Sequence, residues 1–224
     1  MTANTICPTP LIDIDMYNNG INLGTGGSSY DSTVANGGFF SNGKFVTNGT
    51  GSLTVPTDFM SGANQWTIVV AIDGWEPSNT AAYGRFMRGS KDVPSLFYTL
   101  DANGNMFKLA DTTMFQPMCQ WLAPDTFTTK NNVLANALLI DIPKNERTVV
   151  AFRNDGSNIT MWINGEAKIA RKSSYYVNKY YADTFSIGDN ANVGYSLARL
   201  ECSMLKAWNI ALTDSQMPNV LGGA

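Results

Sequence analysis

Apolar and polar residues alternate through residues 147–172, which read RTVVAFRNDGSNITMWINGEAKIARK. Two turn sequences interrupt the alternation, Asn154-Asp155-Gly156 and Asn164-Gly165. Asn-Gly and Asp-Gly are favoured in two-residue hairpin turns because Gly takes a positive φ freely and Asn or Asp tolerates it. Between the turns the side chains fall on two faces, with Ile159, Met161 and Ile163 on one and Asn158, Thr160 and Trp162 on the other. The pattern predicts a three-stranded β-meander whose apolar face needs a second sheet to cover it.

Other stretches have the pattern of strands as well. Residues 65–75 (QWTIVVAIDGW) are apolar on nearly both faces, which is typical of a strand at the centre of a sheet. Residues 95–100 and 106–110 flank a second Asn-Gly turn and predict a hairpin. Further strands are expected at residues 51–56 and 184–188. Two more stretches alternate, residues 11–17 with Ile12, Ile14 and Met16 on one face, and residues 198–208 with Leu200, Cys202 and Met204 opposite Arg199, Glu201 and Ser203.

Two long segments lack a regular period. Residues 18–43 are rich in Gly, Ser and Asn, and we expect a long ordered loop there. Residues 112–136 carry scattered large apolar residues and two prolines, and we expect an insertion packed over one edge. Near the end of the chain, Thr213 or Asp214 can cap a last helical turn. The sequence shows no repeat at a fixed period and predicts a single domain over residues 1–224.

The order of these elements resembles that of the laminin-G-like domain, a jelly roll of the concanavalin-A-like lectin and glucanase type. The likeness is carried by residues 43–56 (GKFVTNGTGSLTVP), 65–73 (QWTIVVAID), 147–166 and 185–217 (FSIGDNANVGYSLARLECSMLKAWNIALTDSQM). The resemblance implies an all-β fold, a two-sheet antiparallel β-sandwich. It specifies the fold better than the function, because the same sandwich hosts glycan binders, adhesion modules, structural parts and hydrolases.

Composition excludes several classes of function. A net charge of −3 and a pI near 4.9 leave no basic surface for nucleic acid. The first residues, MTANTICPTPLIDID, lack the charged and apolar segments of a secretory signal, and no apolar stretch of about 18 residues predicts membrane insertion. The absence of His excludes the usual zinc sites and His-dependent triads. Cys7, Cys119 and Cys202 are odd in number and scattered, which favours buried free thiols in a reducing cytosol over a disulfide framework.

The carboxylates of the chain lack the spacing of a glycosidase active site. Retaining glucanases of the resembled fold carry a Glu-x-Asp-x-Glu run on one strand, which sets the acid and the nucleophile about 5–5.5 Å apart. The nearest run here, Leu11-Ile12-Asp13-Ile14-Asp15, has no Glu at either end. No i, i+4 carboxylate pair replaces it among Glu76, Glu146, Glu166 and Glu201. We therefore expect a protein that is not an enzyme.

Two loops carry side-chain oxygens of the kind that bind calcium. Asp101, Asn103 and Asn105 alternate like the oxygen ligands of a calcium loop, but Met106 stands where an EF-hand needs Gly. A hairpin tip explains the same residues, and Asp189 is a second candidate of the same weak kind. We assign no metal and no other cofactor, with calcium as the weaker alternative.

Aromatic side chains are the candidates for glycan contact, because sugar rings stack on aromatic faces while Asn, Asp and backbone groups bond the hydroxyls. Trp75 ends the central strand, and a polar, tyrosine-rich connection follows the meander at residues 173–183. Glycan contact, a protein interface and plain packing all remain open for these residues. The candidates are Trp75, Tyr175, Tyr176, Tyr180 and Tyr181.

These observations predict a non-enzymatic structural or adhesion protein of a phage virion, a head decoration, head fibre or tail module. Such a protein is assembled in the host cytoplasm without a signal peptide, which reconciles a lectin-like sandwich with free thiols. Its expected partners are other virion proteins or further copies of itself, with host surface glycans as additional ligands. A free-standing carbohydrate-binding lectin module is the alternative, and a glycan hydrolase or lyase of the same fold comes third.

Overall fold

The computed structural model describes residues 6–49, 51–60, 65–76, 83–89, 95–99, 108–109, 112–115, 140–141, 144–172, 183–188 and 197–221. The strands are β1 (Ile12–Asp13), β2 (Thr33–Ala35), β3 (Phe39–Ser41), β4 (Lys44–Gly49), β5 (Ser52–Pro56), β6 (Trp66–Glu76), β7 (Tyr83–Gly89), β8 (Ser95–Thr99), β9 (Lys108–Leu109), β10 (Thr112–Phe115), β11 (Ile140–Asp141), β12 (Thr148–Asn154), β13 (Asn158–Ile163), β14 (Glu166–Lys172), β15 (Thr184–Gly188) and β16 (Leu197–Trp208). Two 3-10 turns, η1 (Gly27–Tyr30) and η2 (Asp58–Met60), and the helix α2 (Met217–Leu221) accompany them.

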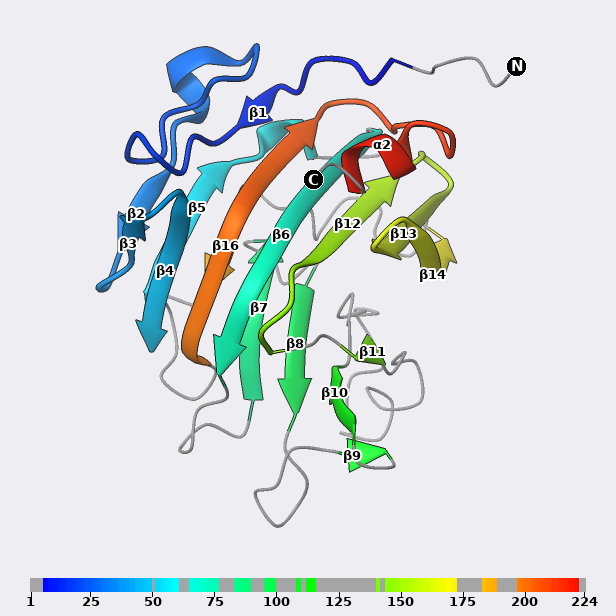
Figure 1. Cartoon of the computed structure of the whole chain (residues 1–224). Helices are drawn as coiled ribbons and strands as arrows, with labels where there is room; N and C mark the ends of the chain where they lie inside the picture. The colour runs from blue at the N-terminus through cyan, green and yellow to red at the C-terminus, as the bar shows by residue number, and fades with distance from the viewer. Residues whose placement is uncertain are drawn as a thin grey trace, which may run out of the picture.

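Two antiparallel sheets face each other as a β-sandwich (Figure 1). The larger has the strand order β14-β13-β12-β6-β16-β4-β3, with β1 paired to β16, and the smaller has the order β2-β5-β15-β7-β8. The short strands β11, β10 and β9 pair in a third sheet. The architecture confirms the two-sheet all-β fold that the sequence predicts. No helix in the described part of the chain is long and apolar enough to cross a membrane.

An inner core fills the space between the two sheets. Strand β6 supplies Ile68, Val70 and Ile72 from the larger sheet, and β5 and β15 supply residues such as Leu53 and Phe185 from the smaller. Val69 and Ala71 of β6 point away from this core and are buried as well. Burial on both faces confirms that residues 65–75 form a central strand.

The predicted meander is confirmed, since β12, β13 and β14 are neighbours in the sheet. Asn164 and Gly165 have φ values of 46° and 88°, as a type I′ turn requires. In the other turn Gly156 has a φ of 89°, and Asp155 does not share the positive region. The carboxylate of Asp155 instead accepts the N–H groups of Ser157 and Asn158, at 2.8 and 2.7 Å. The first turn therefore needs a positive φ only at Gly156, as in a type II′ hairpin.

A second, outer core lies on the face of the larger sheet that is turned away from the smaller sheet. The C-terminal segment and α2 cover part of this face (Figure 1). Trp162, which the alternation places on the polar face of the meander, is buried there for this reason. The outer core consists of Val69, Ala71, Val149, Ala151, Trp162, Trp208, Leu212, Met217 and Leu221.

The predicted helical turn at the C-terminus is present, although α2 begins only at Met217. The backbone N–H of Met217 donates to the carbonyl of Thr213 at 3.0 Å. The N–H of Thr213 donates to Oε1 of Gln216 at 2.8 Å, which is half of a capping box. These bonds fix the direction in which α2 follows the turn at residues 213–216.

Two irregularities in the pairing of β6 with β16 correct the predicted alternation of β16. Glu201 lies opposite Gly74, Cys202 opposite Ile72, and Met204 opposite Ala71. Asp73 on one strand and Ser203 on the other are therefore extra residues, as in β-bulges. Leu200 and Cys202 point into the inner core as expected, but Met204 packs against the outer core because Ser203 shifts the register.

Other expectations change in detail. Ile12, Ile14 and Met16 are buried as predicted, but β1 is only two residues long. The expected loop at residues 18–43 contains η1, β2 and β3. Strand β8 pairs with β7, and β9 with β10, whereas the sequence predicts a hairpin of residues 95–100 with 106–110. Residues 116–139, most of the expected insertion, lie outside the described residues.

The cysteines are consistent with the predicted free thiols where they can be seen. Cys202 is buried and Cys7 is half-buried, and both are free. Burial raises the pKa of the Cys202 thiol well above its usual value. Cys119 lies outside the described residues.

Candidate functional site

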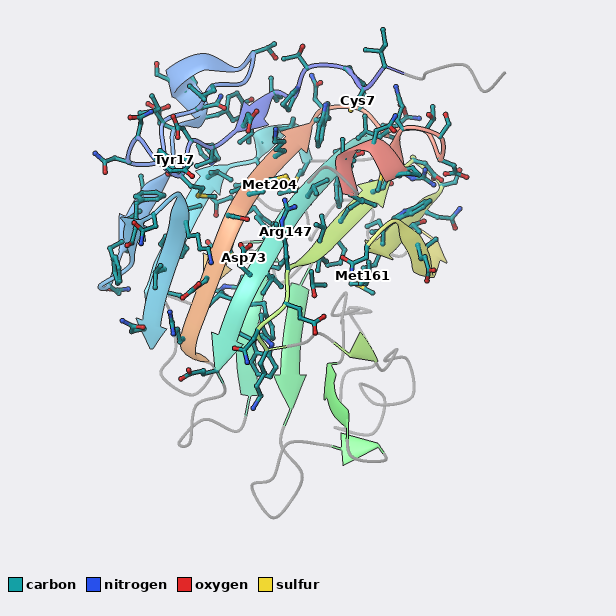
Figure 2. The ribbon with its side chains drawn as sticks, in the orientation of Figure 1. Cys7, Tyr17, Asp73, Arg147, Met161 and Met204 are labelled. Carbon is teal, nitrogen blue, oxygen red and sulfur yellow. The ribbon has the colours of Figure 1, made fainter. Side chains whose placement is uncertain are left out.

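A polar pocket of about 220 Å³ opens where β6 ends and β16 begins, beside the turn at residues 144–146. The N–H of Trp75 donates to the carbonyl of Lys144 at 3.0 Å, which holds this turn against β6. Figure 2 shows Asp73 and Arg147 close together on the outer face of the larger sheet. The pocket is lined by Asp73, Gly74, Trp75, Glu76, Asn145, Arg199 and Glu201.

Asp73 is placed by the bulge in β6. Its side chain is 13% exposed, and its Oδ1 lies 4.0 Å from Nε of Arg147, which is too long for a hydrogen bond. Its Oδ2 is buried and has no hydrogen-bond partner in the described part of the structure. A buried carboxylate oxygen without a donor is costly, so this oxygen needs an explanation.

Glu201 faces the same pocket from β16. Its carboxylate accepts a hydrogen bond from Nζ of Lys44 at 3.0 Å and another from the guanidinium of Arg199. The bond from Lys44 is the main cause that holds the pKa of the Glu201 carboxyl below its usual range, and Arg199 adds to it. The same bond raises the pKa of Lys44. Glu201 is therefore an ionised hydrogen-bond acceptor at neutral pH.

Asp73 and Glu76 of β6 and Glu201 of β16 line the same pocket. No i, i+4 carboxylate pattern along one strand reveals this set, because the pairing of β6 with β16 brings Glu201 beside the other two. A Gly inside a strand, as at Gly74, often marks a bulge and was the signal available in the sequence. Within the described residues there is no group of three His, Cys, Asp or Glu side chains that could hold a metal ion.

Of the three roles left open for Trp75, the structure favours packing. Its side chain is 2% exposed, and its ring packs edge-on against Phe86 with centroids 5.3 Å apart. Nζ of Lys144 lies 5.5 Å from the centroid of the same ring. Trp75 therefore supports the pocket from the inner core and presents no open ring to a sugar.

The glycan-contact candidates Tyr175, Tyr176, Tyr180 and Tyr181, and the calcium candidates Asp101, Asn103, Asn105 and Asp189, lie outside the described residues.

A second pocket, of about 400 Å³, lies between the N-terminal segment, β16 and α2. Its walls include Cys7, Met204 and Lys206. Nε1 of Trp208 donates to the carbonyl of Pro8 at 2.8 Å, which ties the N-terminal segment to β16. Partial burial raises the pKa of the Cys7 thiol, so this thiol is not activated as a nucleophile. The pocket at β6 and β16 has four charged lining side chains against one, Lys206, in this second pocket, which makes it the better candidate for a functional site.

Comparison of the sequence with protein-family models gives no match, and comparison with curated proteins gives none. Solved structures do match the fold. The binding domain of botulinum neurotoxin serotype D has a TM-score of 0.59 at 12% identity over 96% of this chain and 52% of that one. The binding domain of serotype G has a TM-score of 0.57 at 11% identity over 95% of this chain and 50% of that one. The chain thus spans about half the length of these domains.

One further similar structure aligns over nearly the full length of both chains. Domain 4 of AbnA, a GH43 extracellular arabinanase from Geobacillus stearothermophilus, in complex with arabinotriose, has a TM-score of 0.58 at 18% identity. The alignment covers 95% of this chain and 98% of that domain. At such identities the likeness concerns the fold alone, and it shows that the chain has a β-sandwich fold shared with toxin binding domains and an arabinanase domain.

Proposed function

We propose that the protein is a non-enzymatic binding module that holds the hydroxyl groups of a saccharide in the pocket between β6 and β16. The observation that carries this proposal is the convergence of carboxylates with one guanidinium and one amide around a small pocket. Carboxylates accept hydrogen bonds from hydroxyl groups, and the side chains of Arg199 and Asn145 donate hydrogen bonds to hydroxyl oxygens. A pocket of about 220 Å³ is smaller than the usual site for a drug-sized ligand, which suits a single sugar unit.

The charges of the pocket favour a neutral sugar. Glu201 is paired with Lys44 and Arg199, and Asp73 lies beside Arg147. A charged sugar would disturb this balance, whereas hydroxyl groups add hydrogen bonds without adding charge. Oδ2 of Asp73 is the acceptor that gains most, and because it is covered, a hydroxyl reaches it only after a small side-chain rotation of Asp73.

The absence of catalysis is also part of the proposal. Glycoside hydrolysis needs a carboxylic acid that keeps its proton at the working pH, usually because its pKa is raised. The lowered pKa of Glu201 works against that role. The carboxylates of the pocket are therefore proposed to bind sugar and not to cleave it.

Two of the structural likenesses support a binding role. Domain 4 of AbnA is in complex with arabinotriose, and the neurotoxin domains are binding domains. We propose a virion of a phage as the setting, with other virion proteins or further copies as partners and host surface glycans as ligands. The support is the acidic, His-free composition together with the free thiols of Cys7 and Cys202. Detection of the protein in purified, washed particles by mass spectrometry tests this setting, and its absence from particles would favour a free-standing lectin.

The binding role is tested with immobilised neutral polysaccharides, among them arabinan and cellulose-type glucans. We expect saturable binding by the wild type and weaker binding by Gly74→Ala. A Cβ at Gly74 would lie 3.5 Å from the carbonyl oxygen of Lys144 and 3.8 Å from Oε2 of Glu201, so the fold tolerates the methyl group while the pocket narrows. Folded wild-type protein that binds no polysaccharide would contradict the proposal. Release of reducing ends would contradict its non-enzymatic part.

A further inference from the structure

Tyr17 is an exposed aromatic residue at the end of a buried run. Ile12, Ile14 and Met16 before it are buried, whereas Tyr17 is 80% exposed. Figure 2 shows Tyr17 beside β4, toward the edge of the larger sheet that is opposite to β12, while Asp73 and Arg147 lie over the middle of the sheet. Its ring is therefore not needed to fill the inner core.

The ring of Tyr17 is nevertheless held in place. Its far end lies over Gly43, where an added Cβ would come within 2.3 Å of Cζ and 2.6 Å of the hydroxyl oxygen of Tyr17. Gly43 and Asn42 form the turn between β3 and β4, with φ values of 72° and 50°. One side of the ring thus rests against the backbone of a tight turn.

The side chain of Asp15 fixes the backbone of Tyr17 through hydrogen bonds. Oδ1 of Asp15 accepts the N–H of Tyr17 at 2.8 Å and that of Asn18 at 3.2 Å, and Oδ2 accepts Nδ2 of Asn18 at 2.5 Å. The bond from the Asn18 side chain, followed by that from Tyr17, lowers the pKa of the Asp15 carboxyl, so the anchor stays ionised at neutral pH. An exposed ring that is already ordered loses little entropy when it binds a ligand.

One residue connects this ring to the pocket. Lys44 follows Gly43 directly, and its Nζ bonds the carboxylate of Glu201 in the pocket wall at 3.0 Å. Lys44 therefore lies between the turn that the Tyr17 ring covers and the wall of the pocket. A ligand that contacts both must pass over this residue, which calls for neighbouring units of one chain.

We propose that Tyr17 is a stacking subsite for a second unit of the glycan bound at Asp73, so that the protein recognises a neutral oligosaccharide and not a single sugar. This inference rests on the proposed function. The apolar C–H face of a sugar ring covers the open face of the tyrosine, and the hydroxyls at its rim meet water and the polar residues of the 15–20 loop. The pocket supplies hydrogen bonds and Tyr17 supplies apolar area, so affinity rises when the ligand is long enough to reach both.

The test uses NMR titration with arabino- and cello-oligosaccharides of one to six units. The wild type should bind longer chains of the recognised series more tightly than the monosaccharide. Tyr17→Ala should lose this gain, about three- to tenfold for the longest chain, and bind the monosaccharide as the wild type does. Tyr17→Phe should keep the gain because the ring remains.

A matched pair of glycine variants tests the position of the ring. Gly43→Ala forces the Tyr17 ring to move, whereas Gly37→Ala places the same methyl group in an Asn-Gly turn of similar φ, 86°, with nothing within 4 Å. Only Gly43→Ala should lose the chain-length gain. Full-strength binding of the hexasaccharide by Tyr17→Ala would overturn the inference and leave the pocket standing, whereas a wild type that binds no member of either series would overturn both.

Discussion

Replacing Met217 by Ala tests whether α2 covers the part of the outer face that forms the outer core. Met217 is 0% exposed and packs in the outer core with Leu212 and Trp208. Truncation of a buried Met to Ala costs about 2–5 kcal/mol of unfolding free energy, through lost burial and the cavity left behind. Since α2 is near the end of the chain and can relax, we expect the lower part of this range, about 2–3 kcal/mol.

The assay is thermal and urea unfolding followed by circular dichroism and tryptophan fluorescence. A loss of about 2–3 kcal/mol lowers the Tm of a domain of this size by about 4–12 °C. Ile210→Ala is the matched control, since this residue is in the same segment but 42% exposed, and it should change stability by about 0.5 kcal/mol or less. If Met217→Ala unfolds at the same temperature as the control, α2 does not cover the sheet and the reasoning fails.

The other predictions concern backbone space and pH. Gly188→Ala should lower the free energy of unfolding by more than about 2 kcal/mol, because its φ is 78° and the new Cβ would come within 2.4 Å of the carbonyl oxygen of Gly51. Gly49→Ala has a similar φ of 74° but open space around the new Cβ, so it should lose only about 1–2 kcal/mol through backbone strain. Equal urea midpoints for the two variants would contradict this prediction. The pKa of Glu201 is lower in the folded state than its ordinary value of 4.5, mainly because its carboxylate accepts a hydrogen bond from Lys44. The ionised carboxylate therefore stabilises the fold fully at pH values above 4.5, and this contribution is lost as the pH falls through the folded-state pKa. The loss of Tm between pH 6 and pH 3 should therefore be smaller in Lys44→Met than in the wild type, and an identical acid profile would show that the pair has no such effect.

The parts of the fold that the sequence predicts well are those set by local pattern. Strand β6 and the meander follow from runs of apolar residues and from the Asn164-Gly165 turn, whose positive φ values few other residues accept. These features depend on residues close in sequence. The period of two therefore places their side chains correctly, as for Ile159 and Met161.

The candidate site depends on features that no local pattern contains. Asp73 and Glu201 meet only because β6 and β16 pair with a bulge on each strand, and the pairing register of distant strands is not visible in one sequence. The bulge in β16 also turns Met204 to the opposite face. The burial of Trp75 could not be predicted either, because an aromatic residue near a strand end has the same sequence pattern whether its ring is buried or exposed.

Isothermal titration of the wild type and Asp73→Asn with the recognised glycan tests the central claim most directly. The ion pair of Asp73 with Arg147 is long, at 4.0 Å, so the substitution should change stability by less than about 1 kcal/mol. Loss of a hydrogen bond to a charged acceptor should weaken sugar binding by about 1.5–3 kcal/mol, roughly ten- to 150-fold. Asp214→Asn, which removes an exposed carboxylate paired with Arg153, should bind like the wild type. Unchanged affinity in folded Asp73→Asn would contradict the account, because the sugar would then bind elsewhere.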